Sequence, residues 1–176
     1  MLRYIINKIF HINKKSLYEE AIQAGVKMGI GNLIESRFWL PSEPYLISIG
    51  NNCQITHGVM MFTHGGANIA RHQIPDFDCF GKIVIGNDVY IGSNALIMPG
   101  VVIEDHVLVA AGSVVCNSIS SGLVVGGNPA RIICTVDDYI NRNKKYNLNT
   151  KRMSNSQKKF ILEKTSDEQF ISKKYL

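Results

Sequence analysis

The chain has 176 residues, of which 45% are hydrophobic, and a formal net charge of +5. This length fits one domain with an appendage, and the composition is sufficient to bury a core. No run of 18 or more apolar residues occurs, which argues against a membrane-spanning helix. The charge is uneven, because residues 135–176 hold ten Lys/Arg and five Asp/Glu, whereas residues 1–134 hold nine of each. We interpret the basic end as a solvated helical or disordered tail, with an acidic surface or nucleic acid as the alternative partner.

The beginning of the chain resembles a signal peptide only briefly. Its apolar stretch is short, is interrupted by Asn7 and Lys8, and precedes no small-residue cleavage site. The four cysteines stand singly, without a C-x-x-C pair, as expected for free thiols in a reducing compartment. We therefore expect a cytoplasmic protein with no bound metal and no nucleic-acid partner, since neither a Walker loop, a nicotinamide fingerprint nor a nucleic-acid module is present.

In chain order, the first predicted element is a helical segment over residues 1–25. Ser16 and Glu19 form the S-x-x-E pattern of a capping box, and Gly25 is a typical helix stop. Irregular coils are expected from Val26 to Pro44, and regular coils begin at Ile47.

The central part of the chain repeats every six residues. One series consists of β-branched aliphatic residues only: Ile85, Ile91, Ile97, Ile103, Val109 and Val115. A second series of mostly small or β-branched residues lies four positions after each of these: Val89, Ala95, Val101, Val107, Ser113 and Ile119. A period of six fits neither a single helix nor an alternating strand.

Three such hexapeptides can close one triangular coil, and coils that stack at a strand spacing of ~4.8 Å form a parallel β-solenoid. Gly, Asn and Asp at the corners supply the positive φ angles that the turns need. A sandwich or meander is the alternative, but its turns recur every ~8–12 residues, which does not suit a strict six-residue period.

The repeat is interrupted between Gly65 and Lys82. Steps of six from Met61 reach Gln73, which is a poor interior residue. We predict that residues 65–82 form an ordered loop outside the solenoid, and loops of this length in a compact unit are usually functional. Thr135 and Asp138 form a second capping box, where the next helix should begin. The predicted parts of the chain are a helical segment (1–25), the all-β solenoid with its loop (26–134) and a basic helical tail (135–176).

The stretches IVIGNDVYIGSNALIMPGVVIEDHVLVAAGSVV and VVGGNPARII, with SEPYLISIG and FTHGG before them, resemble the bacterial hexapeptide-repeat acyltransferases. Among these, they are most similar to the O-acetyltransferases of surface polysaccharides. The resemblance implies a left-handed parallel β-helix, a homotrimer, acetyl-CoA as the donor and active sites between neighbouring prisms. By their match to the family motifs, four residues are expected to contact the donor: Ser93, Ala111, Ser113 and Arg131. For the arginine there is also a physical reason, because a guanidinium group binds phosphates such as those of CoA.

The resemblance also assigns the catalytic base to His64. Acetyl transfer to a hydroxyl needs a positioned base, and histidine has a free pKa of ~6.5. One coil before His64 the chain is close to Glu43, which is the first candidate for fixing the tautomer of the imidazole. Asp76, Asp78 or a backbone carbonyl are the alternatives. Many family members have an acidic residue directly after this histidine, whereas Gly65 follows it here.

The other histidines are weaker candidates. His106 and His57 lie in predicted turns and His11 lies in the N-terminal segment, whereas His72 lies in the loop and could touch an acceptor or a neighbouring subunit. Carbonic anhydrases with the same repeat bind zinc through spaced histidines, so a zinc site made by His57, His64 and His72 is a distant alternative.

From these features we expect an acetyl-CoA-dependent O-acetyltransferase that acts on a sugar hydroxyl of a surface polysaccharide or its precursor. The alternatives are an amino-sugar N-acetyltransferase, an antibiotic-modifying acetyltransferase and, more distantly, an inactive solenoid scaffold. The acceptor itself is not predicted, because its specificity would lie in the loop and the tail, which the repeat does not constrain.

Overall fold

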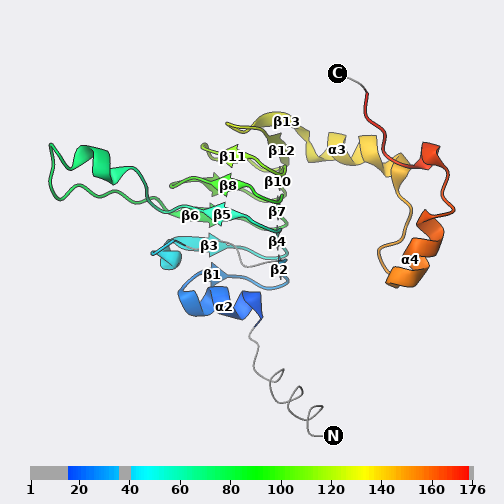
Figure 1. Cartoon of the computed structure of the whole chain (residues 1–176), viewed down its shortest axis with the longest axis horizontal. Helices are drawn as coiled ribbons and strands as arrows, with labels where there is room; N and C mark the ends of the chain where they lie inside the picture. The colour runs from blue at the N-terminus through cyan, green and yellow to red at the C-terminus, as the bar shows by residue number, and fades with distance from the viewer. Residues whose placement is uncertain (1–15, 36–40, 175–176) are drawn as a thin grey trace, which may run out of the picture.

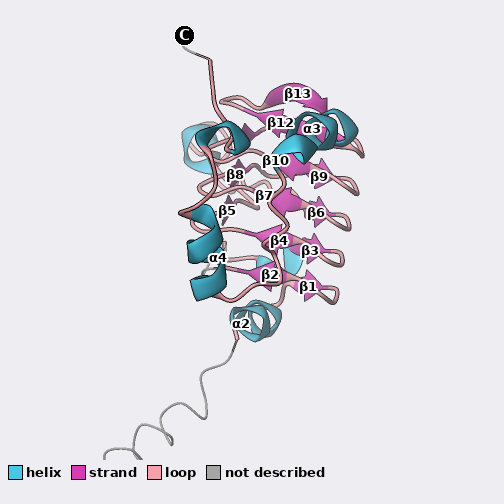
Figure 2. Ribbon diagram, turned by 90° about the vertical axis from the view of Figure 1, so that its right-hand side faces the viewer, coloured by secondary structure: helices cyan, strands magenta, loops and turns pink. Residues whose placement is uncertain are grey.

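The computed structural model describes residues 16–35 and 41–174, in which short strands stack into three sheets (Figures 1 and 2). The first sheet has the order β1 (Lys27–Met28), β3 (Ile47–Ile49), β6 (Ile83–Ile85) and β9 (Val102–Ile103). The second has the order β2 (Leu33–Ile34), β4 (Gln54–Ile55), β7 (Tyr90–Ile91), β10 (Leu108–Val109), β12 (Leu123–Gly126) and β13 (Arg131–Thr135). The third has the order β5 (Met60–Met61), β8 (Leu96–Ile97) and β11 (Val114–Val115). All strand pairs are parallel except β12 with β13.

One regular coil takes 18 residues, as the predicted repeat requires. Position 85 aligns with 103, position 91 with 109, and position 97 with 115, one pair in each sheet. The whole aliphatic series from Ile85 to Val115 points inward and is at most 2% exposed. The second series is also buried, and Ser113 is its polar member. Stacked aliphatic side chains therefore form one continuous core along the axis of the coils, which we call the prism.

The corner between the first and second sheets is a left-handed turn in successive coils. Three aligned residues have the positive φ angles of 56°, 54° and 58° that such a turn requires: Asn52, Asp88 and His106. Beside this turn, the side-chain oxygen Oδ1 of Asn87 accepts a hydrogen bond from the N–H of Asn51 at 2.9 Å. Asp105 Oδ1 does the same for the N–H of Asn87 at 2.6 Å. This side-chain ladder satisfies backbone groups that the strands leave unpaired at the corner.

The N-terminal end of the prism is covered by α2 (Leu17–Ala24), whose Ala21 is buried in the core. Its capping box at Ser16 and Glu19 is present, and Gly25 ends it with a φ of 113°. The predicted helical character of residues 1–15 lies outside the described residues.

The 65–82 loop leaves the prism between β5 and β6 and contains a short 3-10 helix, Ala67–Ala70 (Figure 1). Ile49 aligns with Ile85, which is 36 positions later and therefore two coil lengths away. The loop thus uses the length of a whole coil without adding one to the stack, and the aliphatic core continues without a gap.

After β13, the chain forms α3 (Val136–Asn143), a 3-10 helix (Lys144–Tyr146), α4 (Asn155–Leu162) and a further 3-10 helix (Asp167–Gln169). The predicted capping box of Thr135 and Asp138 begins α3. Among the described residues, none of these helices or α2 combines the length and apolar character that crossing a bilayer requires.

Candidate active site

A pocket of about 290 Å³ lies where the 65–82 loop meets the prism. Its lining comes from three segments that are distant in the sequence: residues 42–43 of the first coil, residues 64–68 at the start of the loop, and Arg71, Asp78 and Phe80 farther along the loop. The fixed coils therefore form one wall of the pocket and the loop forms the other. Such an arrangement is common at sites where a loop supplies function on a rigid scaffold.

His64 and Glu43 contact each other in this pocket. The distance from His64 Nδ1 to Glu43 Oε2 is 2.7 Å, and the Thr63 hydroxyl donates to the same oxygen at 2.8 Å. The His64 side chain is 38% exposed, whereas that of Glu43 is 15% exposed. The structure thus brings together the two residues that the sequence singled out as base and partner, with the imidazole open to solvent and its carboxylate shielded.

The electrostatics of the pair determine which ring nitrogen is free. Burial alone would raise the pKa of Glu43, but hydrogen bonds from Thr63 and His64 outweigh it and hold this pKa below its usual value of 4.5. Glu43 is therefore a carboxylate near neutral pH and can only accept hydrogen bonds. It follows that Nδ1 of a neutral His64 carries the proton and that Nε2 carries the lone pair. Within the described chain, Nε2 has no hydrogen-bond partner.

Two residues that support this pair were not identified as site residues from the sequence. The ring of Phe80 meets the His64 ring edge-on, with centroids 5.6 Å apart, and the backbones of the two residues form an isolated antiparallel bridge. The N–H of Gly81 donates to the Thr63 carbonyl at 2.7 Å, which ties the returning end of the loop to its start. The sequence did hold one signal, because Thr63 lies two positions after the inward-facing Met61. A fully buried hydroxyl at such a position needs a hydrogen-bond partner.

Three of the expected donor contacts lie elsewhere on the prism. Ser93 and Ala111 stack at the corner between the second and third sheets, where the N–H of Gly112 donates to the Ser93 carbonyl at 2.8 Å. His64 lies at the other edge of the third sheet, after β5. Ser113 is fully buried and its hydroxyl donates to the Ala110 carbonyl at 2.6 Å, so this hydroxyl already belongs to the turn. Within one chain, these residues do not join the pocket of His64.

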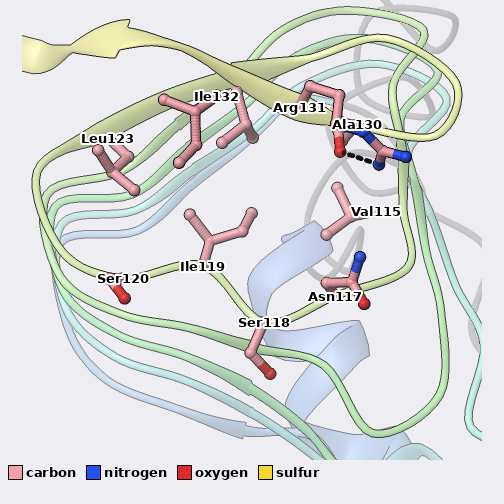
Figure 3. Close-up of a pocket in the computed structure, with 10 residues that line it drawn as sticks. Val115, Asn117, Ser118, Ile119, Ser120, Leu123, Ala130, Arg131 and Ile132 are labelled. Atoms are coloured by element: carbon pink, nitrogen blue, oxygen red, sulfur yellow. Dashed lines mark hydrogen bonds between the residues drawn. The ribbon is translucent and has the colours of Figure 1, made fainter.

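Arg131, the fourth expected donor contact, lies at the C-terminal end of the prism. It borders an opening of about 370 Å³ whose apolar lining includes Val115, Ile119 and Leu123. Figure 3 shows these aliphatic side chains around the opening and Arg131 at its border, where its guanidinium donates to the Ala130 carbonyl at 3.0 Å. This opening is the uncovered end of the aliphatic core and is separate from the pocket of His64.

The alternative partners and ligands lie apart from the His64 ring. Asp76 does not line the pocket, and Asp78 lines it while accepting a hydrogen bond from the N–H of Cys79 at 3.1 Å. His57 and His72 are exposed and do not line the pocket. In residues 16–35 and 41–174, no three His, Cys, Asp or Glu side chains are grouped so that they could hold a metal ion.

An imidazole with its Nδ1 hydrogen held by a carboxylate and its Nε2 open to a pocket can remove a proton from a bound hydroxyl or amine. A neutral ring accepts the proton on Nε2, and the adjacent carboxylate stabilises the imidazolium that results. The site is therefore equipped for general-base chemistry, and its loop wall offers Gly65 and Gly66, where nothing lies within 4 Å of an added Cβ.

Comparison with known proteins identifies relatives along most of the chain. The family model described as bacterial transferase hexapeptide (six repeats) matches residues 82–117. Protein CapG of Staphylococcus aureus is 38% identical over 168 residues, which cover 89% of this chain and 94% of CapG. Chloramphenicol acetyltransferase of Agrobacterium fabrum is 32% identical, with 56% of each chain covered. Galactoside O-acetyltransferase of Escherichia coli is 34% identical, with 54% of this chain and 47% of the relative covered.

Solved structures give the same picture. The hexapeptide-repeat-containing acetyltransferase VCA0836 of Vibrio cholerae aligns with a TM-score of 0.57 and 32% identity, covering 64% of this chain and 63% of the other. Its complex with acetyl coenzyme A aligns with a TM-score of 0.51 and 28% identity, covering 63% and 60%. The chain therefore spans about three fifths of these structures and about half of the two named enzymes, but nearly all of CapG.

Proposed function

Because the chain belongs to the bacterial hexapeptide-repeat acetyltransferase family, we propose that it transfers the acetyl group of acetyl-CoA to a sugar hydroxyl of a surface polysaccharide or its precursor. A member of the family has been solved with acetyl coenzyme A, and the relatives include a galactoside O-acetyltransferase. The left-handed sense of the coils, a homotrimeric assembly and a cytoplasmic location belong to the same proposal. The first two follow from the family resemblance.

The single observation that carries this proposal is the 2.7 Å contact between His64 Nδ1 and Glu43 Oε2, which leaves Nε2 facing a pocket as a free base. In the proposed reaction, Nε2 removes the proton of the acceptor hydroxyl while the oxygen attacks the thioester carbonyl. The tetrahedral intermediate then breaks its C–S bond, and the imidazolium returns the proton to the CoA sulfur. Glu43 touches only the imidazole and therefore positions it and stabilises its charged form.

Backbone amides are the proposed donors to the oxyanion that forms on the acetyl carbonyl. Gly65 and Gly66 expose their backbone on the pocket wall beside His64. Fixed N–H groups aimed at a developing negative charge contribute to catalysis because they need no reorganisation during the reaction.

The donor is proposed to lie along the prism of a neighbouring subunit. Ser93 and Ala111 occupy one edge of the third sheet and His64 occupies the other, so a single chain separates the two halves of the site. In a trimer, one subunit would supply His64 and its neighbour the donor contacts. Ser93, Ala111 and Ser113 would act mainly through their backbone, and Arg131 would meet a CoA phosphate.

Replacement of His64 by Ala tests the role of the base. We expect turnover with acetyl-CoA and a glycan acceptor to fall at least ~100-fold while the melting temperature is unchanged, because general-base catalysis typically contributes this much. His57→Ala, which removes an exposed histidine outside the pocket, is the matched control and should retain full turnover. Undiminished turnover of His64→Ala would refute the assignment.

A second candidate has a specific observation in its favour, namely the similarity to a chloramphenicol acetyltransferase over 117 residues. Labelled acetyl-CoA offered with glycans, free sugars, amino sugars and antibiotics would separate these activities. An unprotonated amine needs less help from a base, so a mild effect of His64→Ala would favour N-acetylation. If acetyl-CoA does not raise the melting temperature at all, the chain is an inactive scaffold, because any ligand of the folded state must stabilise it.

A further inference from the structure

Residues 136–174, which we call the arm, leave the prism instead of folding back onto it. Within the described chain, α3 packs against β12 and β13, but α4 has no comparable packing with any other element. Figure 1 shows the arm reaching out from the top of the stack, on the side opposite the 65–82 loop. The second half of the arm thus has regular structure without a partner in its own chain.

This structure needs a partner, because α4 is short and exposes apolar side chains. Its eight residues are fewer than the ~12–15 that make even a favourable isolated helix stable in water. Its capping box at Ser154 and the exposed pair of Lys159 and Glu163 at 3.5 Å add little. Phe160 is 58% exposed and, together with Met153, lines an open apolar groove of about 480 Å³. An apolar surface is therefore required to cover the groove.

The charges of the arm and of the prism are complementary. Residues 144–164 hold seven Lys/Arg and one Glu, whereas residues 83–130 hold no Lys or Arg at all. The three acidic residues in that part of the prism are exposed and lie at the corner between the first and second sheets: Asp88, Glu104 and Asp105. We call this corner the acidic ridge.

The acidic ridge is bordered by apolar side chains that its own arm does not cover. Val84 and Val102 align in the first sheet and point outward, with exposures of 38% and 39%. Tyr90 points outward from the second sheet on the other side of the ridge and is 39% exposed. The prism therefore presents both features that the arm lacks, namely an apolar surface and negative charge.

We propose that the arm docks on the acidic ridge of a second copy of this chain. Phe160 and Met153 cover the outward valines and the tyrosine, and the lysines of α4 surround the acidic side chains. Arm and ridge are different surfaces, so the contact is heterologous, and such contacts close into a ring when the rotation between subunits allows it. The inference rests on the self-association assumed in the proposed function, but it does not depend on acetyl transfer, since neither surface contains His64.

Photo-crosslinking from position 160 tests the partner. Two differently tagged full-length copies are co-expressed, and only one carries p-benzoyl-phenylalanine in place of Phe160. We expect irradiation to link the two tags covalently and the crosslinked peptides to map to residues 84–107. Crosslinks confined to one copy, or crosslinks to any other part of the prism, would overturn the proposal.

Hydrogen exchange of the full-length protein gives an independent readout that does not use activity. Amides of α4 should exchange at least ~10-fold more slowly than in an unstructured peptide, and Phe160→Asp should abolish this protection. Ile30→Asp is the matched control, because Ile30 is 76% exposed in the first coil, away from the ridge, and should leave α4 protected. Protection of α4 that appears only with anionic phospholipid vesicles or with RNA would assign the arm to those partners and reject the second copy.

Discussion

Gly81→Ala should damage the active site although Gly81 touches neither His64 nor Glu43. Gly81 ends the 65–82 loop, where its N–H donates to the Thr63 carbonyl and its neighbour Phe80 contacts the His64 ring. A Cβ added at Gly81 would lie 2.2 Å from the backbone nitrogen of Gly100 and 2.6 Å from the carbonyl carbon of Pro99. Both obstacles are backbone atoms of the next coil, so no side chain can rotate away to make room.

The size of the effect follows from these distances. Ordinary contact begins near 3.4 Å, so the returning loop must move by ~1 Å or more, and the hydrogen bond to Thr63 is 2.7 Å long. A shift of this size breaks that bond and withdraws the Phe80 ring from the imidazole. We expect the free energy of unfolding to fall by about 1–3 kcal/mol, as for other overpacked sites, and turnover to fall ~100-fold, as for a 1 Å misplacement of a catalytic group.

Thermal unfolding and release of free CoA thiol from acetyl-CoA measure the two effects separately. Lys82→Ala is the control, because it truncates the next side chain, which is exposed, without adding an atom at the contact. If Gly81→Ala melts and turns over like the wild type, the backbone around Gly81 accommodates a Cβ and the coupling of this residue to His64 is wrong.

Three further predictions test the partner of His64, the core and a corner. Glu43→Gln should lower turnover at least ~10-fold, because an amide can no longer hold Nδ1–H with a charge. The pKa of Glu43 is lowered in the folded protein, so its contribution to stability is present above its unfolded value of 4.5 and is lost as the pH falls through the folded value. The melting-temperature advantage of wild type over Glu43→Gln should therefore be constant above about pH 5 and shrink in acid, and an advantage that grew in acid would contradict the assignment. Ile91→Ala, at a fully buried position between Ile55 and Val109, should cost about 2–5 kcal/mol in denaturant unfolding, and a loss below 1 kcal/mol would mean that the stacked aliphatic core is not tightly packed. His106→Gly should stabilise the protein by about 0.5–1 kcal/mol, because a φ of 58° strains any residue with a Cβ, whereas Lys82→Gly, which lacks this φ, should not.

Where the sequence is periodic, it predicts the fold well, and the reason is physical. Each inward position of the 85–115 region repeats the same steric requirement as the position one coil earlier, so an aliphatic side chain recurs at the same phase. The loop was predictable as an interruption of that phase, because Gln73 occupies a position that would otherwise be interior. The details of the loop were not predictable, since the edge contact of Phe80 with His64 depends on how the returning segment crosses the prism.

The donor side was predicted from motifs and not from periodicity, and the structure separates these residues in space. Ser113 illustrates the difference, because a serine in the inward series looks like a site residue in the sequence, yet its hydroxyl is consumed by the Ala110 carbonyl. Ser93 is similarly engaged, since its hydroxyl donates to that of Thr56 at 3.3 Å. Buried hydroxyl groups on a solenoid first satisfy neighbouring groups, and only groups at an open edge remain available to a ligand.

The pairing of Glu43 with His64 depends on an irregularity that a regular repeat conceals. A coil of 18 residues counted back from His64 ends at Leu46, whereas the first coil aligns Ile34 with Ile55 and Met28 with Ile49, each 21 positions apart. Glu43 is also 21 positions before His64, so the three additional residues of this coil bring a carboxylate, and not Leu46, opposite the imidazole. Lengthening the coil before the catalytic histidine thus replaces the acidic neighbour that is missing at Gly65, because the carboxylate comes from one coil below instead of from the next residue.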